Sequence, residues 1–162
     1  MPARKQRTVE ELKEASNHLH YEAWMLTSLA SGLASGIAGQ GPVANALLES
    51  FVIHVRALMD FLYAEAPQSD DVVAEDYFAN PDEWRRERPL LQDLLAQAKR
   101  RAGKEIAHLT YARLDVTPET KPWPFIQIAE EITAVLNVFL ANVPNENLGS
   151  QWNGLRRTSR CQ

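Results

Sequence analysis

Apolar residues recur at helical spacing in four long segments of this chain, and proline or glycine separates each segment from the next. In the first segment a leucine stands at every seventh position from Leu12 to Leu33, an interval of two helical turns. No segment alternates apolar and polar residues with the period of two that marks a strand. The pattern therefore predicts an all-α protein, a four- or five-helix bundle.

Local signals place the ends of the first two helices. Thr8 followed three positions later by Glu11 has the spacing of a capping box and predicts the first helix start. The glycine-rich stretch 28–41 is expected to end that helix. Pro42 is a favoured first residue for the second helix, which we expect to continue to about Ala66, just before the next proline.

The second half of the chain predicts two more long helices, over about 90–114 and from about 123 or 125 to 142. Between the second and third long helices we expect a short helix in the acidic stretch 68–80, capped by Ser69 or Asp70. Another short helix should start at Asn80, where a proline follows the cap.

The length of 162 residues suggests one domain, and the distribution of charged residues along the chain suggests where this domain begins and ends. A basic, flexible N-terminus over 1–7 precedes the helical bundle domain at 8–142, and a polar C-terminal tail follows at 143–162, with Trp152 as a possible anchor for part of it. The net charge of the whole chain is −4, so the body between the basic ends is acidic. An acidic body argues against a general nucleic-acid binder.

Composition also predicts where the protein acts. The single cysteine, Cys161, cannot form an intrachain disulfide, which fits a reducing compartment. The basic N-terminus lacks the apolar segment of a signal peptide, and no apolar run approaches a membrane span. We therefore expect a cytoplasmic protein with no membrane partner.

The stretch 100–111 holds the strongest candidate site. Arg101 and His108 are seven positions apart, about two turns of a helix, so a regular helix would place both on one face. Lys104 lies between them on that face, and Tyr111 follows one turn later. A guanidinium beside a titratable imidazole predicts a site for an anion such as phosphate. On the second helix, Arg56 could assist.

An arginine followed, after six intervening residues, by a histidine is the pattern of Arg101 and His108. This pattern resembles the signature of the HEPN superfamily, in its abortive-infection-like branch. The similarity covers mainly 45–115 and departs from the family at Ala102, where relatives carry a polar residue. The resemblance implies a metal-independent endoribonuclease or a degenerate relative, involved with RNA in defence or as a toxin, without a cofactor. It also implies a homodimer that pairs two motifs across its interface, and a possible protein partner or antitoxin.

The resemblance assigns chemistry to the two motif residues. His108 would move a proton at the 2′-hydroxyl or at the leaving oxygen, because an imidazole titrates near neutral pH. Arg101 would stabilise the negative charge that develops on the phosphorane-like transition state. Lys104, Tyr111 and Arg56 would bind the RNA.

Three other interpretations stay open. Arg56 and Asp60 have the spacing of an ion pair along one helix, which favours a structural role; alternatively Arg56 or His54 points toward the third helix and joins His108. Glu105 and His108 have the spacing of a di-iron ligand pair, but a second copy is missing and His18 and His20 are poorly placed, so we expect no metal. Finally, the protein could be a non-catalytic helical-bundle interaction protein with no enzymatic activity, and its Arg–His face an ordinary solvated surface.

Overall fold

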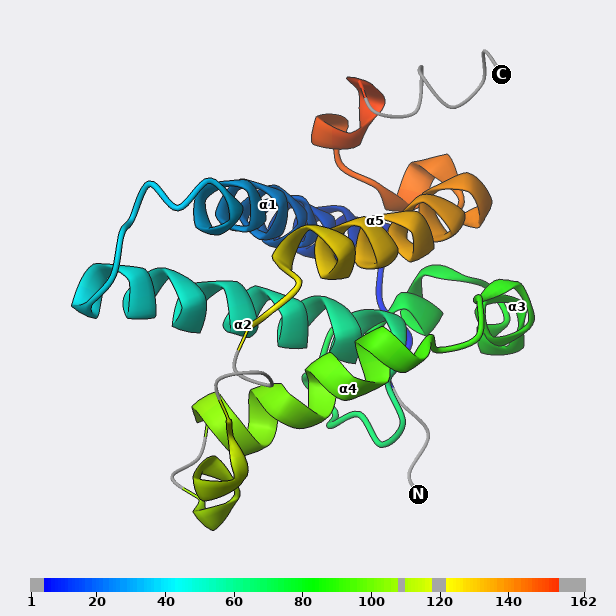
Figure 1. Ribbon diagram of the computed structural model, residues 1–162. Helices are drawn as coiled ribbons and strands as arrows, with labels where there is room; N and C mark the ends of the chain where they lie inside the picture. Colours follow the sequence, from blue (N-terminus) through cyan, green and yellow to red (C-terminus); the bar gives the residue numbers. More distant parts are fainter. Residues whose placement is uncertain (1–4, 108–109, 118–121, 155–162) are drawn as a thin grey trace.

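The computed structural model describes residues 5–107, 110–117 and 122–154, and within them it contains helices and no strand. The prediction of an all-α bundle is confirmed. The five α-helices of the described residues are α1 (Val9–Ala34), α2 (Pro42–Leu62), α3 (Pro81–Glu87), α4 (Asp93–Arg101) and α5 (Phe125–Asn142) (Figure 1).

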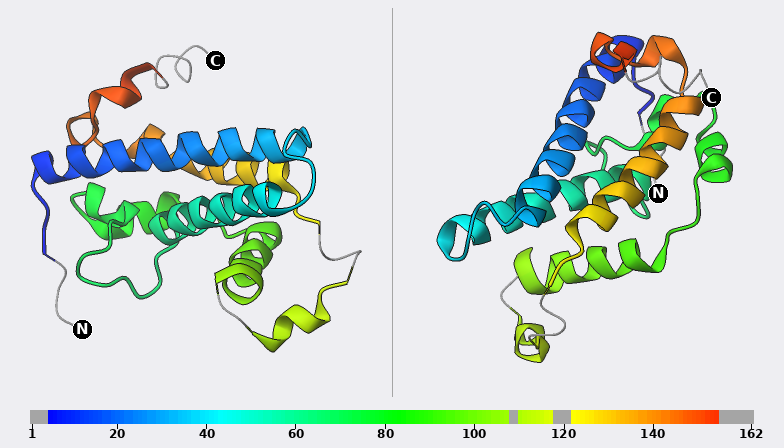
Figure 2. Two further views of the ribbon diagram at one scale, coloured as in Figure 1. Left: turned by 90° about the vertical axis from the view of Figure 1, so that its left-hand side faces the viewer. Right: turned by 45° about the horizontal axis from the view of Figure 1, so that its top comes forward.

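Helix α2 lies in the middle of the bundle. Helices α1 and α5 lie side by side above it in Figure 1, and α4 crosses below it. The views in Figure 2 show the same order of layers, with α3 at the side of the bundle. Each of α1, α4 and α5 contacts α2, so the core forms around this central helix.

Helix α1 starts at the predicted capping box. The backbone N–H of Glu11 donates to the Thr8 hydroxyl over 3.2 Å, and the N–H of Thr8 donates to the Glu11 carboxylate over 2.8 Å. The second bond, together with Lys5, lowers the pKa of Glu11, because both favour the charged carboxylate. The helix ends at Ala34, before Gly36 and Gly39, whose φ angles of 68° and 62° suit glycine.

We predict that Thr8→Ala lowers the free energy of unfolding by about 1 kcal/mol, because it leaves the Glu11 N–H without its cap. Urea unfolding followed by circular dichroism measures the change. Thr27→Ala is the matched control, since Thr27 is exposed in the interior of the same helix, where alanine is favoured. Equal losses in the two variants would contradict the role of the cap.

The second helix ends at Leu62, four residues before the predicted Ala66. The Trp84 indole N–H donates to the Leu62 carbonyl over 3.0 Å, and the Arg88 guanidinium donates to the same oxygen over 3.2 Å. In a longer helix, a backbone N–H of the next turn would donate to the Leu62 carbonyl. Here side chains from distant residues satisfy it instead. The chain is therefore free to turn at Tyr63.

The acidic stretch after α2 forms a short 3-10 helix, η1 (Ala74–Tyr77), so the cap predicted at Ser69 or Asp70 is wrong. The Tyr77 ring is buried, and its hydroxyl donates to the Leu12 carbonyl over 3.0 Å. Burial raises the pKa of Tyr77, and the neighbouring Asp76 adds to the effect. The short helix predicted after Asn80 is confirmed as α3, and Asn80 caps it.

The third long helix is much shorter than the predicted 90–114. Helix α4 ends at Arg101, where a π-helical segment, η2 (Ala102–Ala107), takes over, and η3 (Tyr111–Asp115) is a 3-10 helix. The Thr110 hydroxyl donates to the Lys104 carbonyl over 2.7 Å, and Arg113 donates to the Ile106 carbonyl over 3.2 Å. Side chains thus satisfy backbone groups that a continuous α-helix would pair internally.

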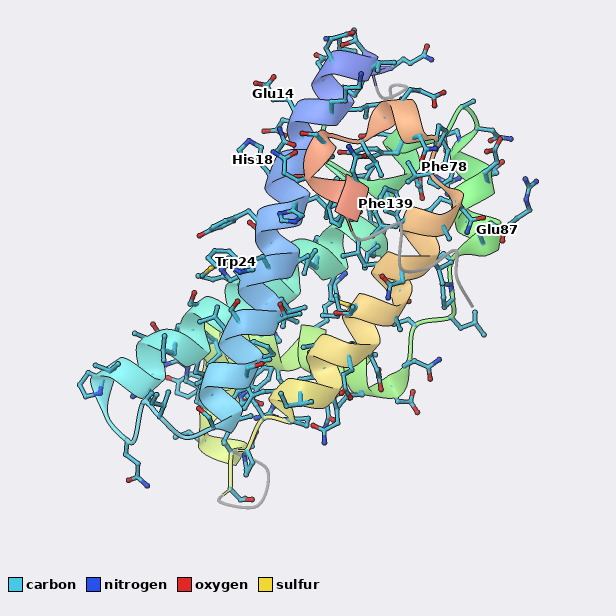
Figure 3. All side chains as sticks on the ribbon, turned by 90° about the horizontal axis from the view of Figure 1, so that it is seen from above. Glu14, His18, Trp24, Phe78, Glu87 and Phe139 are labelled. Atoms are coloured by element: carbon cyan, nitrogen blue, oxygen red, sulfur yellow. The ribbon has the colours of Figure 1, made fainter. Side chains whose placement is uncertain are left out.

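Aromatic rings fill the end of the core beside α3. Phe139 of α5 contacts four other rings at centroid distances of 5.1 to 6.0 Å, those of Phe61, Tyr77, Phe78 and Trp84. The Phe139 side chain is fully buried, and Figure 3 shows its position relative to Phe78. This cluster connects α5 with α2, η1 and α3.

The segment after α5 packs on the bundle as far as Trp152, which extends the packed domain beyond the predicted boundary at 142. Val143, Leu148 and Trp152 are buried in the core. The Trp152 indole N–H donates to the Ser16 carbonyl over 3.0 Å, and the Gly149 N–H donates to the Ser16 hydroxyl over 2.8 Å. The predicted anchoring of this segment by Trp152 is confirmed.

Part of the basic N-terminus also contacts the bundle. Arg7 donates to the Ser69 carbonyl over 2.8 Å, and Lys5 lies 3.2 Å from the Glu11 carboxylate. Residues 1–4 lie outside the described residues. Lys5 and Arg7 therefore belong to the surface of the bundle.

Helix α5 is, within the described residues, the one helix long and apolar enough to cross a membrane by length and composition. The expectation of no membrane partner therefore stays a prediction. A core helix also meets this test, and α5 buries one apolar face of seven residues, including Ile132 and Phe139, in the core.

Candidate functional site

Arg101 is the last residue of α4, and its side chain is held on several sides. Its Nε and Nη2 donate to the two carboxylate oxygens of Glu105 over 2.8 and 2.9 Å. Nη1 donates to the Pro122 carbonyl over 3.1 Å, and the guanidinium carbon lies 4.3 Å from the ring centroid of Trp123. Arg101 therefore ties the end of α4 to the segment that leads into α5.

Packing accounts for the residue that follows Arg101. Ala102 is completely buried and contributes to the hydrophobic core. A polar residue at this position would lose its hydration without a hydrogen-bond partner in an apolar core. The buried, apolar surroundings therefore account for a small apolar residue at this position.

The other predicted site residues have different surroundings. His108 lies outside the described residues. Lys104 in η2 is exposed, and Tyr111 in η3 is 90% exposed. Because η2 is π-helical, the spacing argument that placed Arg101, Lys104 and Tyr111 on one face of a regular helix does not apply.

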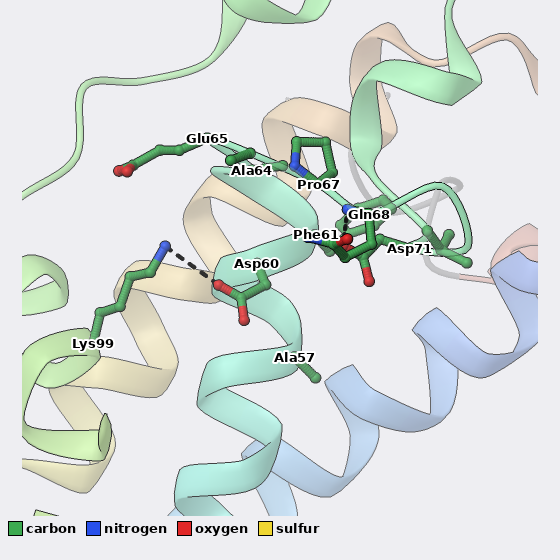
Figure 4. A pocket seen from close by; sticks show the side chains of 11 residues that line it. Ala57, Asp60, Phe61, Ala64, Glu65, Pro67, Gln68, Asp71 and Lys99 are labelled. Carbon is green, nitrogen blue, oxygen red and sulfur yellow. Dashed lines mark hydrogen bonds and ion pairs between the residues drawn. The ribbon is translucent and has the colours of Figure 1, made fainter. Parts of the chain in front are cut away.

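The predicted pair between Arg56 and Asp60 is wrong. The Asp60 carboxylate lies 3.3 Å from the Lys99 ammonium, so it connects α2 with α4 instead of pairing along α2 (Figure 4). Arg56 is exposed on α2. The crossing of α4 brings the long Lys99 side chain to Asp60, an arrangement that spacing within one helix cannot reveal.

His54 points toward α1, which contradicts the interpretation that it faces the third helix. Its Nδ1 lies 2.6 Å from the Glu22 carboxylate, and its ring meets the Tyr21 ring edge-on at a centroid distance of 5.9 Å. The His54 side chain is buried. The pair of His54 and Glu22 therefore connects the two longest helices.

A hollow of about 550 Å³ lies between the C-terminal end of α2, the following turn and Lys99. Asp60, Glu65 and Asp71 line it, and Asp71 accepts a hydrogen bond from the Gln68 N–H over 2.6 Å (Figure 4). Three carboxylates against one lysine make this hollow unsuitable for a phosphate. Sequence reasoning missed it because the helix was expected to continue through the residues that form the turn.

Two of the residues considered as metal ligands, Glu105 and His20, have other partners. Glu105 holds Arg101, and His20 packs edge-on against Trp152 at 5.1 Å between centroids. Across 5–107, 110–117 and 122–154, no group of three or more His, Cys, Asp or Glu side chains gathers around a possible metal position.

Basic residues are concentrated around Arg101. The stretch 99–113 contains five lysines and arginines and one acidic residue, Glu105, in a chain whose net charge is −4. Lys99, Arg100 and Arg101 form the last turn of α4, where positive charge interacts favourably with the helix dipole. Lys104 and Arg113 are exposed beyond that turn and extend the positive charge into η2 and η3.

No family model, curated protein or solved structure matches the chain. The HEPN resemblance therefore remains a prediction based on the spacing of Arg101 and His108 and on the residues around them.

Proposed function

We propose that the protein is a HEPN-like, metal-independent endoribonuclease that acts as a homodimer through the basic stretch 99–113. One observation carries the proposal: the Arg101 guanidinium is fixed by Trp123 and Pro122 within the stretch where basic residues outnumber acidic ones five to one. A planar cation with several fixed donors suits the charge of a phosphodiester and of its transition state.

The proposed reaction needs a base, an acid and a cation. His108 of one protomer takes the proton of the RNA 2′-hydroxyl, whose oxygen then forms a bond to phosphorus. The bond from phosphorus to the 5′-oxygen breaks, and the second copy of His108 in the dimer donates a proton to that oxygen. Arg101 stabilises the extra negative charge, Lys104 and Arg56 bind neighbouring phosphates, and Tyr111 stacks on a base.

A non-catalytic interaction protein is the second candidate, and two observations favour it. Glu105 already neutralises the charge of Arg101. Large apolar side chains are also exposed on α1 and α2, among them Trp24 and Ile53, at 57% and 62% exposure. Figure 3 shows the position of Trp24 on α1. Such side chains would suit contact with another protein.

We expect the purified protein to cleave RNA in the presence of EDTA, and we expect Arg101→Ala and His108→Ala each to reduce the rate by about 100-fold or more. The readout is the initial rate on a fluorescently labelled single-stranded RNA. Arg86→Ala is the matched control, because it removes an exposed arginine from α3, outside the stretch 99–113. Its rate should equal that of the wild type.

Two results would overturn the nuclease proposal in favour of the interaction protein. The first is no cleavage by the wild-type protein. The second is cleavage that persists unchanged in His108→Ala, which would point to a contaminating nuclease. Because Arg101 also has structural contacts, thermal unfolding of Arg101→Ala should be recorded alongside its rate.

A further inference from the structure

Glu105 occupies the edge of Arg101 that an oxyanion would use. Its two carboxylate oxygens accept hydrogen bonds from Nε and Nη2 over 2.8 and 2.9 Å, the two-point geometry by which a guanidinium also binds phosphate. The side chains of Arg101 and Glu105 are 15% and 19% exposed. A phosphate that reached this edge of Arg101 would therefore have to displace the carboxylate.

The two partners are anchored unequally. The contacts of Arg101 with the Trp123 ring and the Pro122 carbonyl do not involve Glu105. Within the described residues, the Glu105 carboxylate makes hydrogen bonds to Arg101 alone. Glu105 can thus rotate away without breaking another side-chain bond, while the guanidinium stays in place.

We infer that Glu105 is an internal competitor for the anion-binding edge of Arg101, and that an RNA phosphodiester binds there by replacing it. The inference rests on the proposed function, because that function makes Arg101 the residue that receives the phosphate. Glu105 then weakens RNA binding until it is displaced, while Trp123 and Pro122 hold the guanidinium.

Binding without cleavage tests this inference directly. The probe is a fluorescein-labelled single-stranded RNA with 2′-O-methyl groups throughout, which lacks the attacking hydroxyl, and the measurement is fluorescence anisotropy at one fixed salt concentration. Glu105→Gln keeps the size of the side chain and removes its charge. We expect it to bind the probe about tenfold more tightly than the wild type does.

Two control variants separate competition from general charge. Glu87→Gln removes a carboxylate from exposed Glu87 on α3 and changes the net charge by the same amount (Figure 3). It should bind like the wild type. The double variant Arg101→Ala/Glu105→Gln should lose the gain, since the edge that Glu105 vacates no longer exists. Glu105→Ala should bind as tightly as Glu105→Gln, and its melting temperature shows whether the fold persists.

The inference is wrong if Glu105→Gln and Glu87→Gln bind equally, or if the gain persists in the double variant. Failure of the proposed function has a different signature. In that case no variant cleaves unmodified RNA, although Glu105→Gln still binds the methylated probe more tightly in a way that depends on Arg101. If cleavage depends on Arg101 and His108 but Glu105→Gln binds the methylated probe like the wild type, the nuclease proposal is supported. The inference that Glu105 competes with RNA is then overturned.

Discussion

Replacing Phe139 by alanine should lower the free energy of unfolding by about 3–5 kcal/mol, a large fraction of the stability of a domain of this size. Phe139 is fully buried and contacts four other aromatic rings. Its removal takes apolar surface out of the core and leaves a cavity that those large rings can fill only partly. Urea unfolding followed by far-ultraviolet circular dichroism measures the loss.

Two further substitutions serve as controls for Phe139→Ala. Phe139→Leu should cost less than Phe139→Ala, because leucine fills part of the same volume. Leu90→Ala should change stability by less than about 0.5 kcal/mol, since Leu90 is 86% exposed. A loss below about 1 kcal/mol for Phe139→Ala would show that the ring cluster is not part of the core.

Trp152→Ala should destabilise the protein by a similar amount, about 3–5 kcal/mol, although it lies beyond the last long helix. The indole is buried, contacts the ring of His20 and donates to the Ser16 carbonyl over 3.0 Å. Without it, the segment that carries Gly149 loses a hydrogen bond and a ring contact with α1. Thermal unfolding and limited proteolysis of this segment should both report the change.

Trp152→Phe separates the hydrogen bond from the packing. It keeps most of the apolar surface and removes the indole hydrogen bond to the Ser16 carbonyl, at an expected cost of about 1 kcal/mol. Trp24→Ala is the matched control, because this tryptophan is mostly exposed on the same helix that Trp152 covers. If Trp24→Ala destabilised the protein as much as Trp152→Ala, the attachment to α1 would not explain the effect.

The elements that were predicted correctly depend on residues close together in the chain. The start of α1 follows from Thr8 and Glu11, three positions apart, and the start of α3 from Asn80 and the proline after it. The range predicted for α5 follows from a broad apolar face repeated over several turns. Each of these signals lies within one continuous segment of the chain, so tertiary contacts are not needed to find it.

The elements that were predicted too long end where distant residues intervene. Helix α2 ends at Leu62, where the side chains of Trp84 and Arg88 donate hydrogen bonds to the Leu62 carbonyl. Both residues lie more than twenty positions later in the chain. The third helix becomes π-helical after Arg101, where Ala102 is buried. Apolar periodicity continues through both places, so the sequence alone could not show that the helices end there.

The same distinction applies to the candidate site. The sequence by itself determined the all-α class, the starts of α1, α2 and α3 and the basic stretch around Arg101, because each depends on spacing or on charge along the chain. Only the tertiary structure decided that Trp123 and Pro122 hold the Arg101 guanidinium. Likewise only the tertiary structure decided that His54 pairs with Glu22 and Asp60 with Lys99. These partners come from segments that meet when the helices pack, and their distances follow from the crossing of helices.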